Sequence, residues 1–303
     1  MILCTGESLI DMVPADGQYR PLSGGAVYNT TVALGRLGEE TAYFWPISRD
    51  PFGEQLLRPL VEAGVDTALC PRTDRLTTLA FVTLTGGEAR YAFYDEGSAG
   101  RMLRPEEVPV LPPRISALFA GGISLVPDPC GAAIESLIAR ETGRLPIMLD
   151  PNIRPFFIQD EAAYRARLAR LLPMADIVKL SGDDLEWLYP GQSHQQAARE
   201  VLALGPRVVL QTGGAEGARA HWAGETVFAP SFKVQVADTI GAGDTFNAGV
   251  LASLSRQGML SPDGLAALTA GHLTAALTLG AQAAAITVSR HGANPPWAHE
   301  MPA

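Results

Sequence analysis

Lysine and cysteine are the two residue types that this chain of 303 residues has least of. Its three cysteines, Cys4, Cys70 and Cys130, lie far apart and form no C-x-x-C pair. They therefore fit neither a disulfide framework nor a zinc site, and they favour a reducing compartment. Only Lys179 and Lys233 are lysines, which leaves 21 of the 23 basic residues as arginine. A biased base composition of the gene explains the excess of arginine over lysine. Because lysine is so rare in this chain, each of the two lysines is of interest.

Signals for export and for membrane insertion are also missing. The first residues lack a basic segment followed by an apolar one. The longest apolar stretch, 266–288, is interrupted by Thr269, His272 and Gln282 and so suits a buried helix better than a membrane span. The net charge of −9 disfavours binding to nucleic acid or to an anionic membrane. We therefore expect a soluble, cytoplasmic protein with neither of these partners.

What the chain does have is a large supply of apolar residues in a regular order. Hydrophobic residues make up 47% of the sequence, enough for a large core. Short β-rich runs alternate with helical patterns. We expect strands at 2–6, 41–47, 118–123, 146–149, 177–180, 208–212 and 233–236, and helices at 29–37, 53–63, 130–140, 161–172, 183–189 and 194–204. This order predicts an α/β fold, a doubly wound, mostly parallel sheet flanked by helices.

Two β-hairpins interrupt the alternation. Residues 76–85 and 88–94 flank Gly86-Gly87, and residues 218–223 and 226–229 flank Gly224-Glu225. The first hairpin either extends the main sheet or forms a small separate sheet, and we favour the separate sheet. It would be a flap, or lid, built from about 12–22 and 76–97. No linker rich in Ser, Gly and Pro divides the chain, so we expect one domain over 1–303.

The sharpest motif is Asp238-Thr239-Ile240-Gly241-Ala242-Gly243-Asp244-Thr245-Phe246, which opens an apolar helix. The Gly-Ala-Gly turn presents backbone N–H groups to an anion, and the helix dipole favours negative charge there. A carboxylate at such a site repels the anion unless it accepts a proton, as a general base does in phosphoryl transfer. The alternative is that Asp244 caps the helix and that Gly241 and Gly243 only permit the turn.

This motif resembles the second signature of the ribokinase-like, PfkB-type carbohydrate kinases. Other segments agree with that family in order along the chain: Gly6-Glu7-Ser8-Leu9-Ile10-Asp11, Ser23-Gly24-Gly25-Ala26-Val27-Tyr28-Asn29, Asp50-Pro51-Phe52-Gly53 with Ser48 in place of Gly, Asp150-Pro151-Asn152-Ile153-Arg154-Pro155, and Ser289-Arg290-His291-Gly292-Ala293. The resemblance implies a ribokinase-like fold, a β-sheet lid and ATP-dependent phosphorylation of a hydroxyl with Mg²⁺. It also implies that Asp244 is the base and that the N–H groups of Gly241, Ala242 and Gly243 form the anion hole.

The same resemblance implies which residues bind the sugar and which bind the nucleotide. On the sugar side it implies Asp11, Gly24, Gly25, Asn29, Arg90, Tyr91, Tyr94 and Arg154, because paired donors and acceptors hold a polyol. Each has a plainer alternative: a surface carboxylate for Asp11, a helix N-cap for Asn29, an ion pair with Asp150 for Arg154, and packing for the lid aromatics. On the nucleotide side it implies Lys179, Thr212, Gly214, Gly217 and Gln282.

Ions complete the expected site. Asp184 stands where the family has Glu, and Ser181 where it has Asn, so we expect Asp184 to reach Mg²⁺ through water. Asp183 is adjacent and could substitute, and the plainer alternative is an acidic pair favoured by the helix dipole. The backbone around Asp238 and Ile240 is expected to hold a monovalent cation, K⁺.

The acceptor sugar is the open question. The lid segment resembles that of bacterial fructokinases, which implies phosphorylation of fructose to fructose 6-phosphate. The nearest alternative is a 2-keto-3-deoxygluconate kinase or another PfkB-type sugar kinase. Asp95 and Glu96 would repel an anionic acceptor, although Arg101 weakens that reasoning if it folds into the pocket.

Other classes of protein fit less well. A catalytically silent sugar- or nucleotide-binding regulator is the alternative from another class. A P-loop kinase is excluded because neither lysine follows the required glycine. The lid edge further suggests a homodimer.

Overall fold

The computed structural model describes residues 1–85 and 88–302, with the side chains of residues 84–90 left out. Within these residues, eight strands form the large sheet in the order β14-β13-β12-β11-β10-β9-β1-β4. Their bounds are β1 Ile2–Thr5, β4 Thr41–Phe44, β9 Ala117–Gly121, β10 Ile147–Asp150, β11 Ile177–Ser181, β12 Val208–Thr212, β13 Ala218–Trp222 and β14 Glu225–Ala229. From β4 to β12 all neighbours are parallel, and β13 and β14 add an antiparallel edge. The predicted fold class is confirmed.

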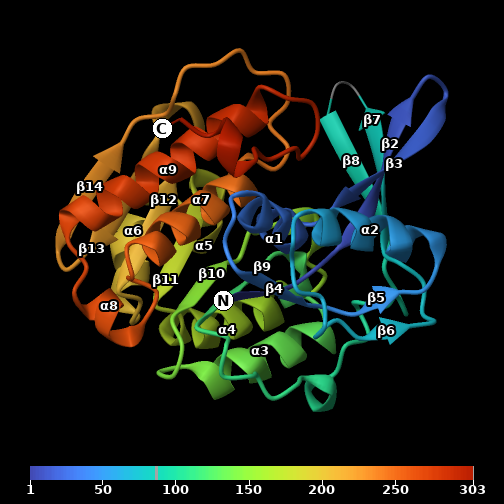
Figure 1. Ribbon diagram of the computed structural model, residues 1–303, viewed down its shortest axis with the longest axis horizontal. Helices are drawn as coiled ribbons and strands as arrows, with labels where there is room; N and C mark the ends of the chain where they lie inside the picture. Colours follow the sequence, from blue (N-terminus) through green and yellow to red (C-terminus); the bar gives the residue numbers. More distant parts are fainter. Residues whose placement is uncertain (86–87, 303) are drawn as a thin grey trace.

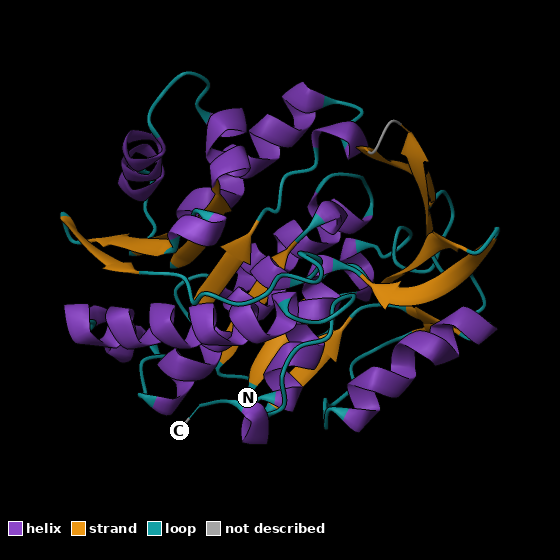
Figure 2. Cartoon of the chain, turned by 90° about the horizontal axis from the view of Figure 1, so that it is seen from above, coloured by secondary structure: helices purple, strands orange, loops and turns teal. Residues whose placement is uncertain are grey.

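Helices cover both faces of this sheet. They are α1 Ala26–Arg36, α2 Pro51–Glu62, α3 Cys130–Glu141, α4 Glu161–Leu171, α5 Gly182–Leu188, α6 His194–Ala203, α7 Ala242–Arg256, α8 Pro262–Ala266 and α9 Ala270–Val288. Helices α1, α7 and α9 pack together on one face. Helices α3 to α6 connect β9, β10, β11 and β12, along which the chain steps across the sheet in the opposite direction to the step from β1 to β4 (Figures 1 and 2). Right-handed crossovers in opposite directions place these two groups on opposite faces.

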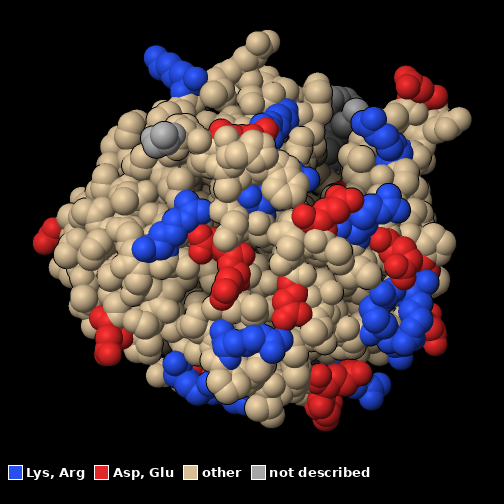
Figure 3. Space-filling model, viewed as in Figure 1, with Lys and Arg blue, Asp and Glu red and all other residues tan. Residues whose placement is uncertain are grey.

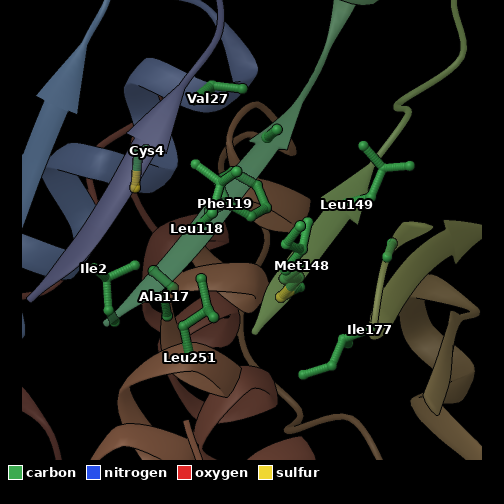
Figure 4. Packing of buried hydrophobic residues seen from close by; sticks show 14 of the residues in the cluster. Ile2, Cys4, Val27, Ala117, Leu118, Phe119, Met148, Leu149, Ile177 and Leu251 are labelled. Carbon is green, nitrogen blue, oxygen red and sulfur yellow. The ribbon is translucent and has the colours of Figure 1, made fainter. Parts of the chain in front are cut away.

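The core lies between the sheet and these helices. Every residue of β1, β4, β9 and β10 is buried, as expected for parallel strands covered on both sides. Figure 4 shows Leu251 of α7 close to Ile2, Ala117 and Met148 on three neighbouring strands. No helix in the described part of the chain has the length and apolarity that crossing a bilayer requires.

A second sheet of four strands stands apart from the first, in the order β3-β2-β7-β8. It comprises β2 Leu9–Ala15, β3 Gln18–Gly24, β7 Leu79–Thr85 and β8 Glu88–Tyr94. Figure 1 shows it projecting from the body beside α1 and α2, as a lid. The hairpin therefore builds a separate sheet rather than extending the large one, as expected. Its predicted Gly86-Gly87 turn lies outside the described residues.

Two local expectations are wrong. The helix predicted over 29–37 begins at Ala26 with Gly25 as its N-cap, so Asn29 lies inside the first turn and does not cap it. The strand predicted over 233–236 does not form, and those four residues are exposed. The chain leaves the sheet after β14 at Pro230, which has no N–H for a ladder hydrogen bond, so the following apolar residues stay outside the sheet.

Candidate functional site

Several motifs that the sequence analysis singles out lie where the strand order reverses. The chain crosses the large sheet one way from β1 to β4 and the other way from β9 to β12. Crevices form at such switch points, beyond the carboxyl ends of the strands. Asp150 is the last residue of β10, and Lys179 lies on the neighbouring β11. The start of α7 and the lid sheet complete the surroundings of this end of the sheet.

Asp244 is held by two helices at this end. Asn29 of α1 donates its side-chain N–H to Asp244 Oδ2 at 2.8 Å, and the Thr30 hydroxyl donates to the Asp244 carbonyl at 3.1 Å. Figure 1 shows α1 and α7 side by side, with many contacts between them. The carboxyl is only 8% exposed. Its position and orientation are thus fixed by residues more than two hundred positions away in sequence.

The electrostatics of Asp244 suit proton exchange near neutrality. Burial raises its pKa from 3.8 to about 7; the hydrogen bond from Asn29 lowers it, the charge of Asp150 raises it, and the charges of Lys179 and Arg154 lower it. A carboxyl with a pKa near the working pH can accept a proton and release it again. The arrangement can therefore serve as a general base for a hydroxyl placed beside it.

The turn before Asp244 offers amide hydrogens. Gly241 has φ of 78°, and a Cβ there would lie 2.8 Å from the Cβ of Ala293, so only glycine fits. The Ala242 N–H donates to the Thr239 carbonyl at 3.3 Å. Within the described part of the chain, the N–H groups of Gly241 and Gly243 have no hydrogen-bond partner. Together with the start of a 15-residue helix, they favour an anion.

A buried polar network lies beneath this turn. Lys179 Nζ is 3.2 Å from Asp150 Oδ2, which also accepts a hydrogen bond from the Asn247 side chain at 2.7 Å. Lys179 is 4% exposed, and Asn247 is 1% exposed. The sequence predicts Lys179 on the nucleotide side, and neither Asp150 nor Asn247 is among the site residues that it predicts. Asn247 follows Asp244 by three residues on one helix, a spacing that could have revealed it.

Asp184 occupies a closed position. Its Oδ1 accepts the N–H of Ile153 at 2.7 Å, and its Oδ2 accepts the N–H and the hydroxyl of Ser181 at 2.7 and 2.6 Å. The residue is 1% exposed. It thereby ties the start of α5 to the segment after β10. In the part of the chain that the structure describes, no three His, Cys, Asp or Glu side chains are grouped so as to hold a metal ion.

The predicted sugar residues Asp11, Gly24 and Gly25 lie together at the base of the lid. Leu9 to Ala15 of β2 pair with Gln18 to Gly24 of β3. A Cβ at Gly24 would lie 2.2 Å from Asp11 Oδ2, so the carboxylate fills the space that a side chain would need. Burial raises the pKa of Asp11 to about 6. No described residue donates a hydrogen bond to this carboxylate, which leaves both oxygens for a ligand.

The other predicted sugar residues divide into two groups. Arg154 is exposed and donates to the Ile153 carbonyl at 3.1 Å, and its proposed alternative pairing with Asp150 is not found. Tyr91 stacks on Phe156 of the body at a centroid distance of 5.2 Å and an angle of 7°. Tyr94 instead packs edge-to-face on Phe81 within the lid, which is the packing alternative. The side chain of Arg90 lies outside the described residues.

A charged pair closes the inner end of the lid. Asp95 Oδ2 lies 3.5 Å from an Arg101 guanidinium nitrogen, and Asp95 Oδ1 accepts hydrogen bonds from the hydroxyls of Thr78 and Ser98 at 2.9 and 3.1 Å. Both charged residues line a small cavity that Glu7 also lines. Arg101 therefore does fold inward, but it meets Asp95 there. The guanidinium charge is not left open for an anionic ligand.

The predicted nucleotide and cation residues come from three places: the end of β12 and the turn after it, the segment before α7, and α9. Thr212 ends β12, and Gly214 and Gly217 have φ of 56° and 111° in the following turn. Gln282 is half-buried on α9. Asp238 accepts hydrogen bonds from the N–H groups of Ile240 and Gly292 at 3.1 and 2.9 Å, which joins the two segments.

Comparison with known proteins covers the whole chain. Residues 1–300 match the family described as pfkB family carbohydrate kinase. The chain is 47% identical over 273 residues to a fructokinase from Rhizobium leguminosarum bv. trifolii, covering 88% of this chain and 84% of that protein. The structure of fructokinase from Xylella fastidiosa with bound ATP matches with a TM-score of 0.87 at 28% identity, covering 99% of this chain and 94% of the other. A fructokinase variant from Vibrio cholerae O395 with fructose, ADP and potassium ion matches with a TM-score of 0.85 at 25% identity, covering 96% and 93%.

Proposed function

Because the chain belongs to the pfkB family of carbohydrate kinases, we propose that it transfers the γ-phosphoryl group of ATP to the 6-hydroxyl of fructose. The observation that carries this function is the placement of the buried Asp244 carboxyl next to unpaired amide hydrogens at the start of α7. Relatives that bind ATP, ADP and fructose support the choice of ligands. The products are ADP and fructose 6-phosphate.

Each part of the site has a task in this reaction. Asp244 removes the hydroxyl proton as the hydroxyl oxygen attacks the γ-phosphorus, and the bond from that phosphorus to the ADP oxygen breaks. The N–H groups of Gly241 and Gly243 bind the phosphoryl oxygens, and the Ala242 N–H joins them when it leaves its 3.3 Å hydrogen bond to the Thr239 carbonyl. Proton transfer of this kind contributes about 10²–10⁴ in rate, and positioning supplies much of the rest.

The sugar is held between the lid and the body. Asp11 accepts hydrogen bonds from two sugar hydroxyls, Asn29 donates to or accepts from a third, and Gly24 and Gly25 let the sugar approach the backbone. Arg154, Arg90, Tyr91 and Tyr94 complete the sugar site. On the nucleotide side we retain Thr212, Gly214, Gly217 and Gln282.

Ions accompany the nucleotide. Mg²⁺ would supply charge neutralisation on the phosphate oxygens. The closed surroundings of Asp184 disfavour direct ligation, so this residue is proposed to act through water. The backbone carbonyls of Asp238 and Ile240 suit K⁺, because the Asp238 side chain fixes that turn against Gly292.

A neutral acceptor fits the charges better than a sugar acid. Asp11 and Asp95 are acidic, and Arg101 is paired. A carboxylate placed against these groups would be repelled. We therefore place fructose ahead of 2-keto-3-deoxygluconate. We further propose that residues 1–303 act as one ribokinase-like unit in the cytoplasm, with the lid at about 12–22 and 76–97, and that two chains pair through their lids.

The deciding experiment is a coupled assay of ADP release with fructose, ribose, 2-keto-3-deoxygluconate and fructose 6-phosphate as acceptors. We expect the highest kcat/KM with fructose. A preference of tenfold or more for the keto-acid would remove fructose from first place, a threshold of about 1.4 kcal/mol. Asp244→Asn should abolish turnover and retain fructose binding by calorimetry. A silent regulator would show no turnover in the unmodified protein either.

A further inference from the structure

Lys179 has no role in the chemistry described so far, although its surroundings are elaborate. It is one of two lysines in a chain that otherwise uses arginine. Its side chain is 5% exposed, and Nζ lies 3.2 Å from Asp150 Oδ2. A Cβ at Gly243 would lie 3.4 Å from the same nitrogen. The ammonium thus lies between Asp150 at the end of β10 and Gly243 in the first turn of α7.

Neighbouring carboxylates keep this ammonium charged. Burial alone would lower the pKa of Lys179, but the charges of Asp150, Asp184 and Asp244 outweigh burial and raise it above its ordinary value. In return, the positive charge lowers the pKa of Asp244, while Asp150 raises it. Of the two cations that act on Asp244, Arg154 is exposed to solvent and screened by it, whereas Lys179 is buried.

We propose that Lys179 is a positioning residue for phosphoryl transfer: its ammonium, anchored by Asp150, favours ionised Asp244 and adds positive charge beneath the Gly241–Gly243 turn. This inference rests on the proposed function of that site. A compact ammonium suits this enclosed position better than the larger, planar guanidinium, because the side chain is 5% exposed and lies between Asp150 and Gly243. That accounts for a lysine at this position in a sequence rich in arginine.

The test compares the pH dependence of kcat in Lys179→Met, Asp150→Asn and the double variant. Around Asp244, the groups that set this dependence are Asp150, Lys179, Arg154 and the Asn29 amide. We expect Lys179→Met to move the acid limb of the profile up by about one pH unit or more, because a nearby opposite charge is lost. Asp150→Asn should move it down, and the double variant should return it close to the unmodified protein.

The plateau rate separates the two parts of the proposal. Both variants that lack Lys179 should lose roughly tenfold or more in kcat at high pH, because the charge behind the amide turn is missing. Lys233→Met is the matched control, since Lys233 is the other lysine and is exposed; it should change neither the limb nor the plateau. Shifts of the same sign in Lys179→Met and Asp150→Asn, or a normal plateau in the double variant, would overturn the proposal.

A second readout keeps the inference separate from the function. NMR can follow the titration of the Asp244 carboxyl carbon in ¹³C-aspartate-labelled protein with no substrate present. The signal of this carbon is assigned as the one that disappears from the spectrum of Asp244→Asn. The same opposite shifts are expected there, and an Asp244 titration unchanged in both Lys179→Met and the double variant overturns the proposal. If the unmodified protein shows no kinase activity, the proposed function is refuted, and this titration still tests the role of Lys179. If Lys179→Met fails to fold, the double variant is compared with Asp150→Asn: its acid limb and its Asp244 titration should lie at higher pH than in Asp150→Asn, and equal values would overturn the proposal.

Discussion

At the scale of single residues, the buried Asp244 carboxyl couples stability to pH. Its pKa is raised from 3.8 to about 7, so the folded state binds this proton more tightly than the unfolded state does. The stability that this group contributes is complete below its unfolded pKa and is lost as pH rises through about 7. At pH 8 the loss has an upper bound of about 4 kcal/mol, from about three pKa units.

Asp244→Asn should therefore stabilise the fold, and more so at high pH. Asparagine resembles the protonated carboxyl and has no charge to bury. We expect the free energy of unfolding of the variant to exceed that of the unmodified protein by about 2–4 kcal/mol at pH 8 and by much less at pH 5. Urea denaturation at both pH values measures the difference. A gap that does not change with pH would mean that Asp244 does not titrate in this range.

Asp95 offers a test of acceptor charge. In Asp95→Asn the amide oxygen can still accept from Thr78 and Ser98, but the Arg101 guanidinium loses its partner. We expect the ratio of kcat/KM for 2-keto-3-deoxygluconate to that for fructose to rise about tenfold, which is about 1.4 kcal/mol.

Glu96→Gln is the matched control for that change, because Glu96 is adjacent and exposed. It should leave the ratio within about twofold, well inside 1.4 kcal/mol. An unchanged ratio in Asp95→Asn would show that Arg101 does not face the acceptor.

Single residues also mark the limit of prediction from sequence. The motif around Asp244 predicted a carboxyl beside an amide turn because those groups are contiguous in the chain. The pairing of Lys179 with Asp150 depends on two adjacent strands and could not be read from either segment. Asp184 was assigned from a motif position, and the structure adds that its oxygens are already taken by Ile153 and Ser181.

At the scale of elements, the lid meets the body through aromatic rings. Tyr91 and Phe93 of β8 stack on Phe156 at 5.2 and 6.4 Å, and Phe93 meets Phe157 edge-on at 4.8 Å. Phe156 is 59% exposed, so this contact holds the lid without being part of the core. Stacked pairs of this kind contribute about 0.5–1.5 kcal/mol each.

Phe156→Ala should loosen the lid. We expect KM for fructose to rise by about 3- to 10-fold, corresponding to about 0.6–1.4 kcal/mol, with the melting temperature nearly unchanged. Phe228→Ala, at the exposed far edge of the large sheet, removes an equally large ring as the control. A fall in kcat at unchanged KM would place Phe156 in the chemical step rather than in lid closure.

The elements were more predictable than their ends. Alternating apolar runs and helical patterns located the parallel strands because each is buried on both faces. The helix over 26–36 starts early because Gly25, at φ of 111°, turns the chain into it, which apolar spacing alone does not reveal. Residues 233–236 alternate polar and apolar side chains as a strand does, yet in the described part of the chain they pair with no strand after Pro230.

At the scale of the whole molecule, one face of the surface carries charges of both signs. Figure 3 shows acidic and basic side chains interspersed on the face it presents, despite the net charge of −9. The candidate site is built from distant parts of the chain, because residues 29, 150 and 244 come together only when the whole chain is folded.

Ligand binding should consequently stabilise the entire fold, and its two halves can be separated. A ligand that binds only the folded state adds about 2.7 kcal/mol at one hundred times its Kd. Asp11→Asn removes an acceptor with no partner among the described residues and leaves the nucleotide side intact. We expect it to abolish the rise in melting temperature caused by fructose and to preserve the rise caused by ATP. If fructose and ATP both still raise the melting temperature, Asp11 does not hold the sugar. If neither ligand raises it, the sugar and nucleotide subsites are not independent, because the lid that carries Asp11 also closes over the nucleotide.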